Sequence, residues 1–256
     1  MMNNKFLWLV LLLPLLFSCQ KYNKAPFDEK EVKLRKVPDT MKMLMIDSLW
    51  QKRDSLSYLR FKDVHQIYLA ETDSIPMWIN RFDKLQVLFG SNEKVKIKTI
   101  PNNFYQLKNI ERMYLPRNEI SKLEPTFYNL MKLRVLNLDG SKINKISNKI
   151  LNLKNLESID LSDNPITNIP NEICELPKLE SLVLENTQIR ELPKCLGSLQ
   201  NLEWINVSGT QLTAFPVEIL NAPKLDAIHA KNLKLKNYKE VEAICKKKHI
   251  TFYYDE

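Results

Sequence analysis

The sequence predicts an α/β solenoid, a curved parallel β-sheet of about eight strands with short helical or 3-10 turns on its convex side. Residues 156–178 are followed at once by residues 179–201 with the same apolar skeleton, and this period of 23 residues runs five times. Flanking copies begin at Val64, Leu85 and Leu225. Within each copy the order L-x-x-L-x-L alternates leucines with variable residues, which turns the leucines to one face of a short strand.

Polar residues occupy the ninth position of the repeat. A single repeat cannot bury its own leucine face, so the repeats must stack, with strands about 4.8 Å apart. The ninth position then lies at a turn, where backbone N–H and C=O groups need partners. We expect a ladder of side-chain hydrogen bonds there, formed by Asn118, Ser141, Asn164, Thr187 and Thr210. Proline after this turn, as in Ile169-Pro170, redirects the chain toward the convex side.

The motif L-x-x-L-x-L-x-x-N-x-I with a period between 20 and 29 residues resembles the leucine-rich repeat family. The resemblance covers roughly residues 64–256, with the repeats themselves over 64–235. It implies a solenoid whose variable strand residues line a concave face.

Both ends of a solenoid need covers, because the end repeats would otherwise expose leucines to water. We expect residues 39–63 to form an N-terminal capping helix, with Asp39 as its N-cap and apolar residues near helical spacing at Met41, Met45, Leu49, Leu56 and Leu59. We expect residues 236–256 to form the C-terminal cap, a helix around Lys239 to Lys248 followed by a strand from Ile250 to Tyr254.

Residues 1–18 have the features of a secretory signal peptide. Lys5 precedes a 12-residue apolar stretch from Phe6 to Phe17, which is short for a membrane span of about 20 residues. The junction Leu16-Phe17-Ser18-Cys19 resembles the lipobox of bacterial lipoproteins. This resemblance implies that residues 1–18 are removed and that Cys19 is lipidated and anchored to a membrane. An ordinary secretory signal before an unrelated cysteine is the alternative.

The polar, charged segment 19–38 is typical of a flexible tether. No Asp follows Cys19 directly, which by the sorting rules of bacterial lipoproteins favours the outer membrane, with the facing direction left open. The formal net charge is +8, but an exported protein meets little nucleic acid, so we expect no nucleic-acid partner. A solvated surface or attraction to an anionic membrane explains the lysines better.

Catalytic motifs are missing from the sequence. It has three scattered histidines, only four glycines, and no nucleophile elbow, zinc-protease motif or phosphate-binding loop. We therefore expect no enzyme activity and no cofactor. Cys174 and Cys195 lie in adjacent repeats at different repeat positions, and an oxidising compartment permits a disulfide between them. We expect them instead to be unbonded, small apolar residues.

The variable strand residues are the candidate binding residues. The first three repeats place aromatic side chains beside arginines, and both are enriched at the hot spots of protein interfaces. We expect this concave face to bind a protein or peptide, while packing of the aromatics beside the capping helix is the alternative. The candidate binding residues are Tyr68, Phe89, Arg112, Tyr114, Arg117, Asn137, Asp160, Trp204 and Asn206.

The middle of this face is acidic. A calcium site is one hypothesis for these carboxylates, and ordinary solvated charges are the other; the residues are Asp139, Asp160, Asp163 and Glu185. Four Asp-Ser/Thr-apolar tripeptides, beginning at Asp39, Asp47, Asp54 and Asp73, also resemble acceptors of bacterial O-glycosylation. The start of a helix explains at least the first of them equally well.

The sequence as a whole predicts a lipid-anchored, monomeric and non-catalytic interaction module of the bacterial cell envelope. Its expected partner is an unknown protein or peptide. The alternative is a surface adhesin or structural envelope lipoprotein that binds glycan or a host surface. Analogy of fold alone cannot name the ligand.

Overall fold

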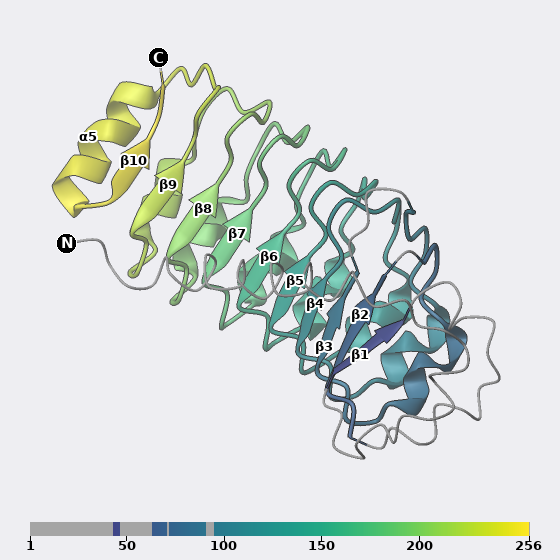
Figure 1. Cartoon of the computed structure of the whole chain (residues 1–256). Helices are drawn as coiled ribbons and strands as arrows, with labels where there is room; N and C mark the ends of the chain where they lie inside the picture. The colour runs from purple at the N-terminus through teal and green to yellow at the C-terminus, as the bar shows by residue number, and fades with distance from the viewer. Residues whose placement is uncertain (1–42, 47–62, 71, 91–94, 256) are drawn as a thin grey trace. The chain divides into compact units, whose positions relative to one another are not determined.

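The structure is a computed structural model that describes residues 43–46, 63–70, 72–90 and 95–255 (Figure 1). The expected signal peptide, the lipidated Cys19 and the tether (19–38) lie outside the described residues. So do most of the expected capping helix and three of the four Asp-Ser/Thr tripeptides. No helix among the described residues is both long enough and apolar enough to cross a membrane.

The described residues form one sheet of ten parallel strands, which lie side by side in chain order (Figure 1). The eight strands expected from the repeats are β2 to β9, and β10 is the expected strand of the C-terminal cap. The strands are β1 (Met43–Ile46), β2 (Gln66–Leu69), β3 (Val87–Phe89), β4 (Arg112–Tyr114), β5 (Val135–Asn137), β6 (Ser158–Asp160), β7 (Ser181–Val183), β8 (Trp204–Asn206), β9 (Ala227–His229) and β10 (Thr251–Tyr253).

A short 3-10 helix connects each strand from β2 to β8 with the next, as predicted, and all of them except η5 begin at or beside a proline. These helices are η2 (Met77–Arg81), η3 (Asn102–Gln106), η4 (Pro125–Asn129), η5 (Asn148–Asn152), η6 (Asn171–Glu175), η7 (Lys194–Ser198) and η8 (Val217–Asn221). Each of them buries at least one apolar residue against the sheet, for example Ile173 in η6. The predicted class of fold is therefore confirmed.

The core is a ladder of apolar residues at the fourth position of the repeat. The register pairs Ile67 with Leu88, Leu88 with Met113, and so on along the sheet. Every member of this ladder is fully buried: Ile67, Leu88, Met113, Leu136, Ile159, Leu182, Ile205 and Ile228. Each repeat therefore buries its apolar face against its two neighbours.

The eighth position of the repeat has a left-handed backbone. Its φ angles lie between 53° and 64° at Arg117, Gly140, Asp163, Asn186, Gly209 and Asn232. Gly, Asn and Asp are the residues that adopt this conformation at the lowest cost. Arg117 is the exception in the series.

The predicted polar ladder at the ninth position is confirmed only where the residue is Asn. Asn118 Oδ1 accepts a hydrogen bond from the backbone N–H of Ile97 in the preceding repeat, at 2.8 Å. Asn164 Oδ1 likewise accepts one from the N–H of Ile143, at 2.8 Å. The hydroxyls of Thr187 and Thr210 donate only to carbonyls three residues earlier in the same repeat.

Ser141 is the weak point of this ladder. Its side chain is too short to span the distance that an Asn amide spans, and its buried Oγ has no hydrogen-bond partner. An unpaired buried polar group costs stability.

A second polar ladder, which we did not predict, runs along the end of each repeat. Asn155 Nδ2 donates to the carbonyl of Met131 in the preceding repeat at 2.8 Å, and its Oδ1 accepts from Lys178 of the next repeat at 2.7 Å. Asn and Lys alternate at this position, so the polar contacts repeat every 46 residues, in the order Asn109, Lys132, Asn155, Lys178, Asn201 and Lys224.

Cys174 in η6 and Cys195 in η7 form a disulfide, with their Cα atoms 5.8 Å apart. The prediction that they are unbonded was wrong. They occupy different positions in their turns, but adjacent turns pack closely enough to bring their Cα atoms into the range that a disulfide needs. The disulfide therefore ties two neighbouring repeats together on the side opposite the strands.

The prediction of a capping helix over 39–63 is wrong for residues 43–46, which form strand β1. This strand pairs with β2 in parallel, and its Leu44 and Ile46 are buried. A short apolar run fits helix and strand periodicity equally well. Without a neighbour on this side, β2 would present a row of unpaired backbone N–H and C=O groups. Residues 43–46 satisfy these groups by pairing with β2 as a strand.

The C-terminal cap is confirmed. Helix α5 (Tyr238–Lys248) buries Val241 and Cys245, and β10 then pairs with β9 in parallel. His249 ends the helix in the left-handed conformation, and its N–H bonds to carbonyls of the last turn.

We predict that Ser141→Asn raises the free energy of unfolding by about 1 kcal/mol, because an amide at this position can bridge to the preceding repeat. Urea unfolding would measure the change. The control Asn164→Ser should lower the free energy of unfolding by about 1–3 kcal/mol, because it leaves buried backbone groups without partners. A lower urea midpoint for Ser141→Asn would contradict this account of the ladder.

Candidate binding surface

We call the side of the sheet formed by the third and fifth repeat positions the strand face. These positions are the first and last residues of the three-residue strands, for example Arg112 and Tyr114 in β4. Their side chains point away from the buried fourth position between them.

An aromatic cluster lies on the strand face at its N-terminal end. The rings of Phe89 and Tyr114 are stacked, with centroids 5.2 Å apart and an angle of 8° between the planes. Tyr68 is the register partner of Phe89 in β2, and all three side chains are partly exposed. The pKa of Tyr114 is raised by burial and lowered in part by Arg112, the guanidinium on the same strand. Three of the predicted aromatic residues therefore lie on adjacent strands.

Arg117 lies at the turn that follows this cluster. Its backbone N–H donates to the carbonyl of Asp139 in the next repeat, and its φ angle is 55°. A left-handed backbone strains a residue with a long side chain by roughly 1 kcal/mol. This strained conformation therefore occurs at a residue that we predicted to bind a partner.

Three other predicted binding residues have structural roles in the strand face. Asn137, Asp160 and Asn206 each accept a hydrogen bond from the backbone N–H two residues later, at 3.0–3.1 Å, and so end their strands. The amide of Asn137 also donates to Asp160 Oδ2 at 3.0 Å, and that of Asn206 donates to Glu185 Oε2 at 2.9 Å. Asn206 is buried. These residues form a polar network that leaves them little capacity for a ligand.

The acidic residues of the middle repeats do converge. The pKa of Asp139 is raised from 3.8 to about 6, first by burial and then by the charges of Asp160 and Asp163, while Arg117 lowers it in part. Burial also raises the pKa of Asp160. Within the described ranges, no three His, Cys, Asp or Glu side chains are arranged to hold a metal ion.

A second aromatic cluster lies at the C-terminal end of the strand face. We predicted Trp204 as a binding residue but did not group it with His229 and Tyr253. Trp204 makes an edge contact with His229, with centroids 5.5 Å apart, and His229 lies 4.3 Å from the ring of the exposed Tyr253. Burial lowers the pKa of His229, as does the charge of Lys231. The predicted strand at Ile250 to Tyr254 could have revealed this cluster, because its register places Tyr253 beside His229.

The two aromatic clusters are separated by four strand steps, from Tyr114 in β4 to Trp204 in β8, which is about 19 Å at 4.8 Å per step. Asn137 and Asp160, which are hydrogen-bonded to each other, lie between the clusters, together with Val135 and Val183. The strand face therefore offers two apolar contact areas on one preformed sheet.

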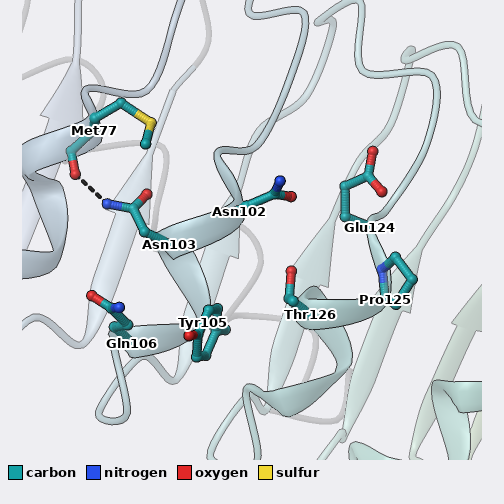
Figure 2. Close-up of a pocket in the computed structure, with 8 residues that line it drawn as sticks. All are labelled: Met77, Asn102, Asn103, Tyr105, Gln106, Glu124, Pro125 and Thr126. Atoms are coloured by element: carbon teal, nitrogen blue, oxygen red, sulfur yellow. Dashed lines mark hydrogen bonds between the residues drawn. The ribbon is translucent and has the colours of Figure 1, made fainter.

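A shallow pocket of about 510 Å³ lies among the 3-10 turns (Figure 2). Figure 2 shows that it is bordered by the exposed side chains of Met77 and Tyr105 and by the start of η4. Asn103 donates from its amide to the carbonyl of Met77, and the carboxylate Glu124 pairs with Lys122 at 2.7 Å. The lining combines amide, hydroxyl and carboxylate groups with the apolar side chains of Met77 and Pro125.

We predict that Asp139→Asn stabilises the protein at about pH 8 and has little effect at about pH 4. The folded-state pKa of Asp139 lies above its ordinary value of 3.8, so the native protein holds this proton more tightly than the unfolded chain and loses stability as the pH rises through 4 to 6. The asparagine variant avoids this loss. Urea midpoints measured across the pH range test the prediction, and a variant that is less stable at about pH 8 would contradict it.

Comparisons with known proteins agree with this architecture. The profile described as "Leucine rich repeat" matches residues 112–166, 132–189 and 154–212. A search of curated protein sequences found no match.

Solved structures share the fold. A leucine-rich repeat protein of Leptospira interrogans aligns with a TM-score of 0.66 and 23% identity, over 85% of this chain and 60% of its own. An internalin of Listeria monocytogenes aligns with a TM-score of 0.64 and 18% identity, over 79% of this chain and 66% of its own. The ectodomain of a receptor kinase of Arabidopsis thaliana, in complex with Casparian strip integrity factor 2, aligns with a TM-score of 0.61 and 22% identity, over 75% of this chain and 23% of its own.

This chain thus spans less than two thirds of the length of the Leptospira protein. The repeats found in the sequence, the profile match and the similar structures lead to one conclusion. The described part of the chain is built from leucine-rich repeats and has the leucine-rich repeat fold.

Proposed function

We propose that this protein is a non-catalytic interaction module of the bacterial cell envelope, anchored by lipid at Cys19, whose strand face binds a protein or peptide. The observation that carries the proposal is the stacked and partly exposed pair Phe89 and Tyr114, with Tyr68 and Arg112 beside it. Leucine-rich repeats are typical of protein interaction modules. Aromatic and arginine side chains supply most of the binding energy in many interfaces.

The rigidity of the sheet supports this function. Each aromatic residue lies on a strand whose neighbouring residue is fully buried, for example Met113 beside Tyr114. A partner that binds there need not order the surface first, so less of the interaction energy is lost to entropy.

Export of the protein is supported by two independent features. Residues 1–19 carry the signal peptide and lipobox pattern, and the Cys174–Cys195 disulfide is of the kind that persists in oxidising compartments. The similar structures from Leptospira and Listeria also suggest a bacterial origin. We place the protein at the outer membrane, because no Asp follows Cys19.

We predict that the triple variant Tyr68→Ser, Phe89→Ser, Tyr114→Ser loses capture of its partner. The protein would be crosslinked mildly in its native cells, and the captured proteins identified by mass spectrometry. The control replaces two exposed apolar residues outside the strand face, Met77 and Tyr105, by Ser. Equal capture by the triple variant and by the control would refute the role of the strand face, and capture of no specific protein would favour a glycan ligand.

A substitution of Arg117 allows a test in which a loss of binding cannot be caused by a loss of stability. We predict that Arg117→Gly raises the free energy of unfolding by about 1 kcal/mol, because glycine adopts φ of 55° without strain. The same variant should weaken partner capture if the guanidinium contacts the partner. Unchanged capture together with higher stability would remove Arg117 from the binding surface and leave the aromatic cluster as the site.

A further inference from the structure

A row of lysines follows one edge of the sheet, where each repeat ends and the next strand begins. A lysine stands three or four residues before every strand from β3 to β10 except β8. We call this row the lysine edge; its members are Lys84, Lys108, Lys132, Lys154, Lys178, Lys224 and Lys248. All of them are exposed. The strands are parallel and lie in chain order (Figure 1). Because each lysine stands at the same place before its strand, the row follows one edge of the sheet.

Uncharged oxygens hold several of these lysines in place. Lys132, Lys178 and Lys224 each donate to the side-chain oxygen of an asparagine in the preceding repeat, at 2.7–2.8 Å. Lys248 donates to the carbonyl of Leu220 at 2.9 Å and to Asn221 Oδ1 at 2.8 Å. These hydrogen bonds fix the ammonium groups without neutralising their charge. Fixed cations lose less rotamer entropy when an anionic surface approaches them.

Some lysines elsewhere in the described residues pair with carboxylates instead. Lys142 pairs with Glu119 at 3.0 Å, and Lys194 pairs with Glu218 at 2.7 Å. On the lysine edge itself, Lys84 pairs with Asp63, and Lys154 pairs with Glu175 at 3.8 Å. Acidic residues also begin some of the strand segments, such as Glu180 and Asp226, two residues after a lysine. The excess of positive charge on the edge therefore rests mainly on the lysines that uncharged oxygens hold, which are Lys132, Lys178, Lys224 and Lys248.

An apolar residue stands within the lysine edge. Met131 is 64% exposed, and the residues at the same repeat position in the two adjacent repeats are Lys108 and Lys154. The exposed side chain of Met131 contributes nothing to the core. It would gain free energy on entering an apolar phase that lies directly beyond a layer of anions.

We propose that the lysine edge docks onto an anionic phospholipid surface, with Met131 entering the headgroup region. Seven strand steps separate Lys84 from Lys248, so the edge extends about 34 Å and can contact many headgroups at once. A hydrated soluble polyanion could pair with the lysines but would not remove the side chain of Met131 from water. Docking by this edge leaves the strand face accessible to a partner, so the inference does not depend on the proposed function.

A tryptophan probe tests this proposal in the full chain, so that residues 1–38 contribute equally to all variants. Met131→Trp places the probe in the lysine edge, and Asn144→Trp places a matched probe at an exposed site after strand β5, on the opposite edge. Brominated phosphatidylglycerol vesicles should quench the Met131→Trp emission, and brominated phosphatidylcholine vesicles should not. About 1 M salt should abolish the quenching, because it shortens the screening length to about 3 Å.

Charge variants in the Met131→Trp background complete the test. Replacing Lys132, Lys178 and Lys224 by Ser should raise the lipid concentration needed for half-maximal quenching about a hundredfold. The control replaces Lys145, Lys234 and Lys236, which follow strands instead of preceding them, and changes the net charge equally. Thermal unfolding of each variant confirms that it is folded.

Three results would overturn the proposal. Equal quenching of the probes at residues 131 and 144 would mean that the edge is not the contact, and equal loss in both lysine triple variants would mean that only net charge matters. Binding of polyphosphate with the same lysine dependence, and without quenching by vesicles, would assign the edge to a soluble polyanion.

Discussion

The structure depends on the burial of one apolar side chain per repeat between its equivalents in the two neighbouring repeats. Eight such residues at the fourth position are fully buried, and each is worth roughly 1.5–3 kcal/mol in transfer free energy. An isolated repeat gains little of this free energy, because its apolar residues leave water only when a neighbouring repeat stacks on each side. The parallel sheet, the 3-10 turns and the caps are consequences of this requirement.

Two ladders of polar side chains serve the same stacking. Asn118 and Asn164 satisfy backbone groups inside the turns, where an unpaired group would cost more than a neutral hydrogen bond gains. Asn109, Asn155 and Asn201 connect the ends of repeats at the surface and hold lysines of the following repeats. In the inner ladder, the polar residue is needed because the backbone is buried. In the outer ladder, the residue type is less constrained, which allows Asn and Lys to alternate and a row of positive charge to build up.

The variable positions of the strands are of two kinds. Asn137, Asp160 and Asn206 end their strands by bonding to the backbone two residues later, so their polarity has a structural cause. The aromatic residues at the two ends of the strand face have no comparable backbone role and remain partly exposed. The candidate binding residues are therefore these two clusters and Arg117, which places a long charged side chain at a left-handed turn position where the other repeats have Gly, Asn or Asp.

The sequence by itself determined the repeat period, the register of the buried ladder and the helix and strand of the C-terminal cap, because apolar spacing alone decides which residues must face the core. The aromatic residues at Tyr68, Phe89 and Tyr114 could be placed on one face for the same reason. Only the tertiary structure decided that residues 43–46 are a strand and that Cys174 and Cys195 bond. These features depend on which segments of different repeats or caps become neighbours in space, and the spacing of residues within one repeat carries no information about that.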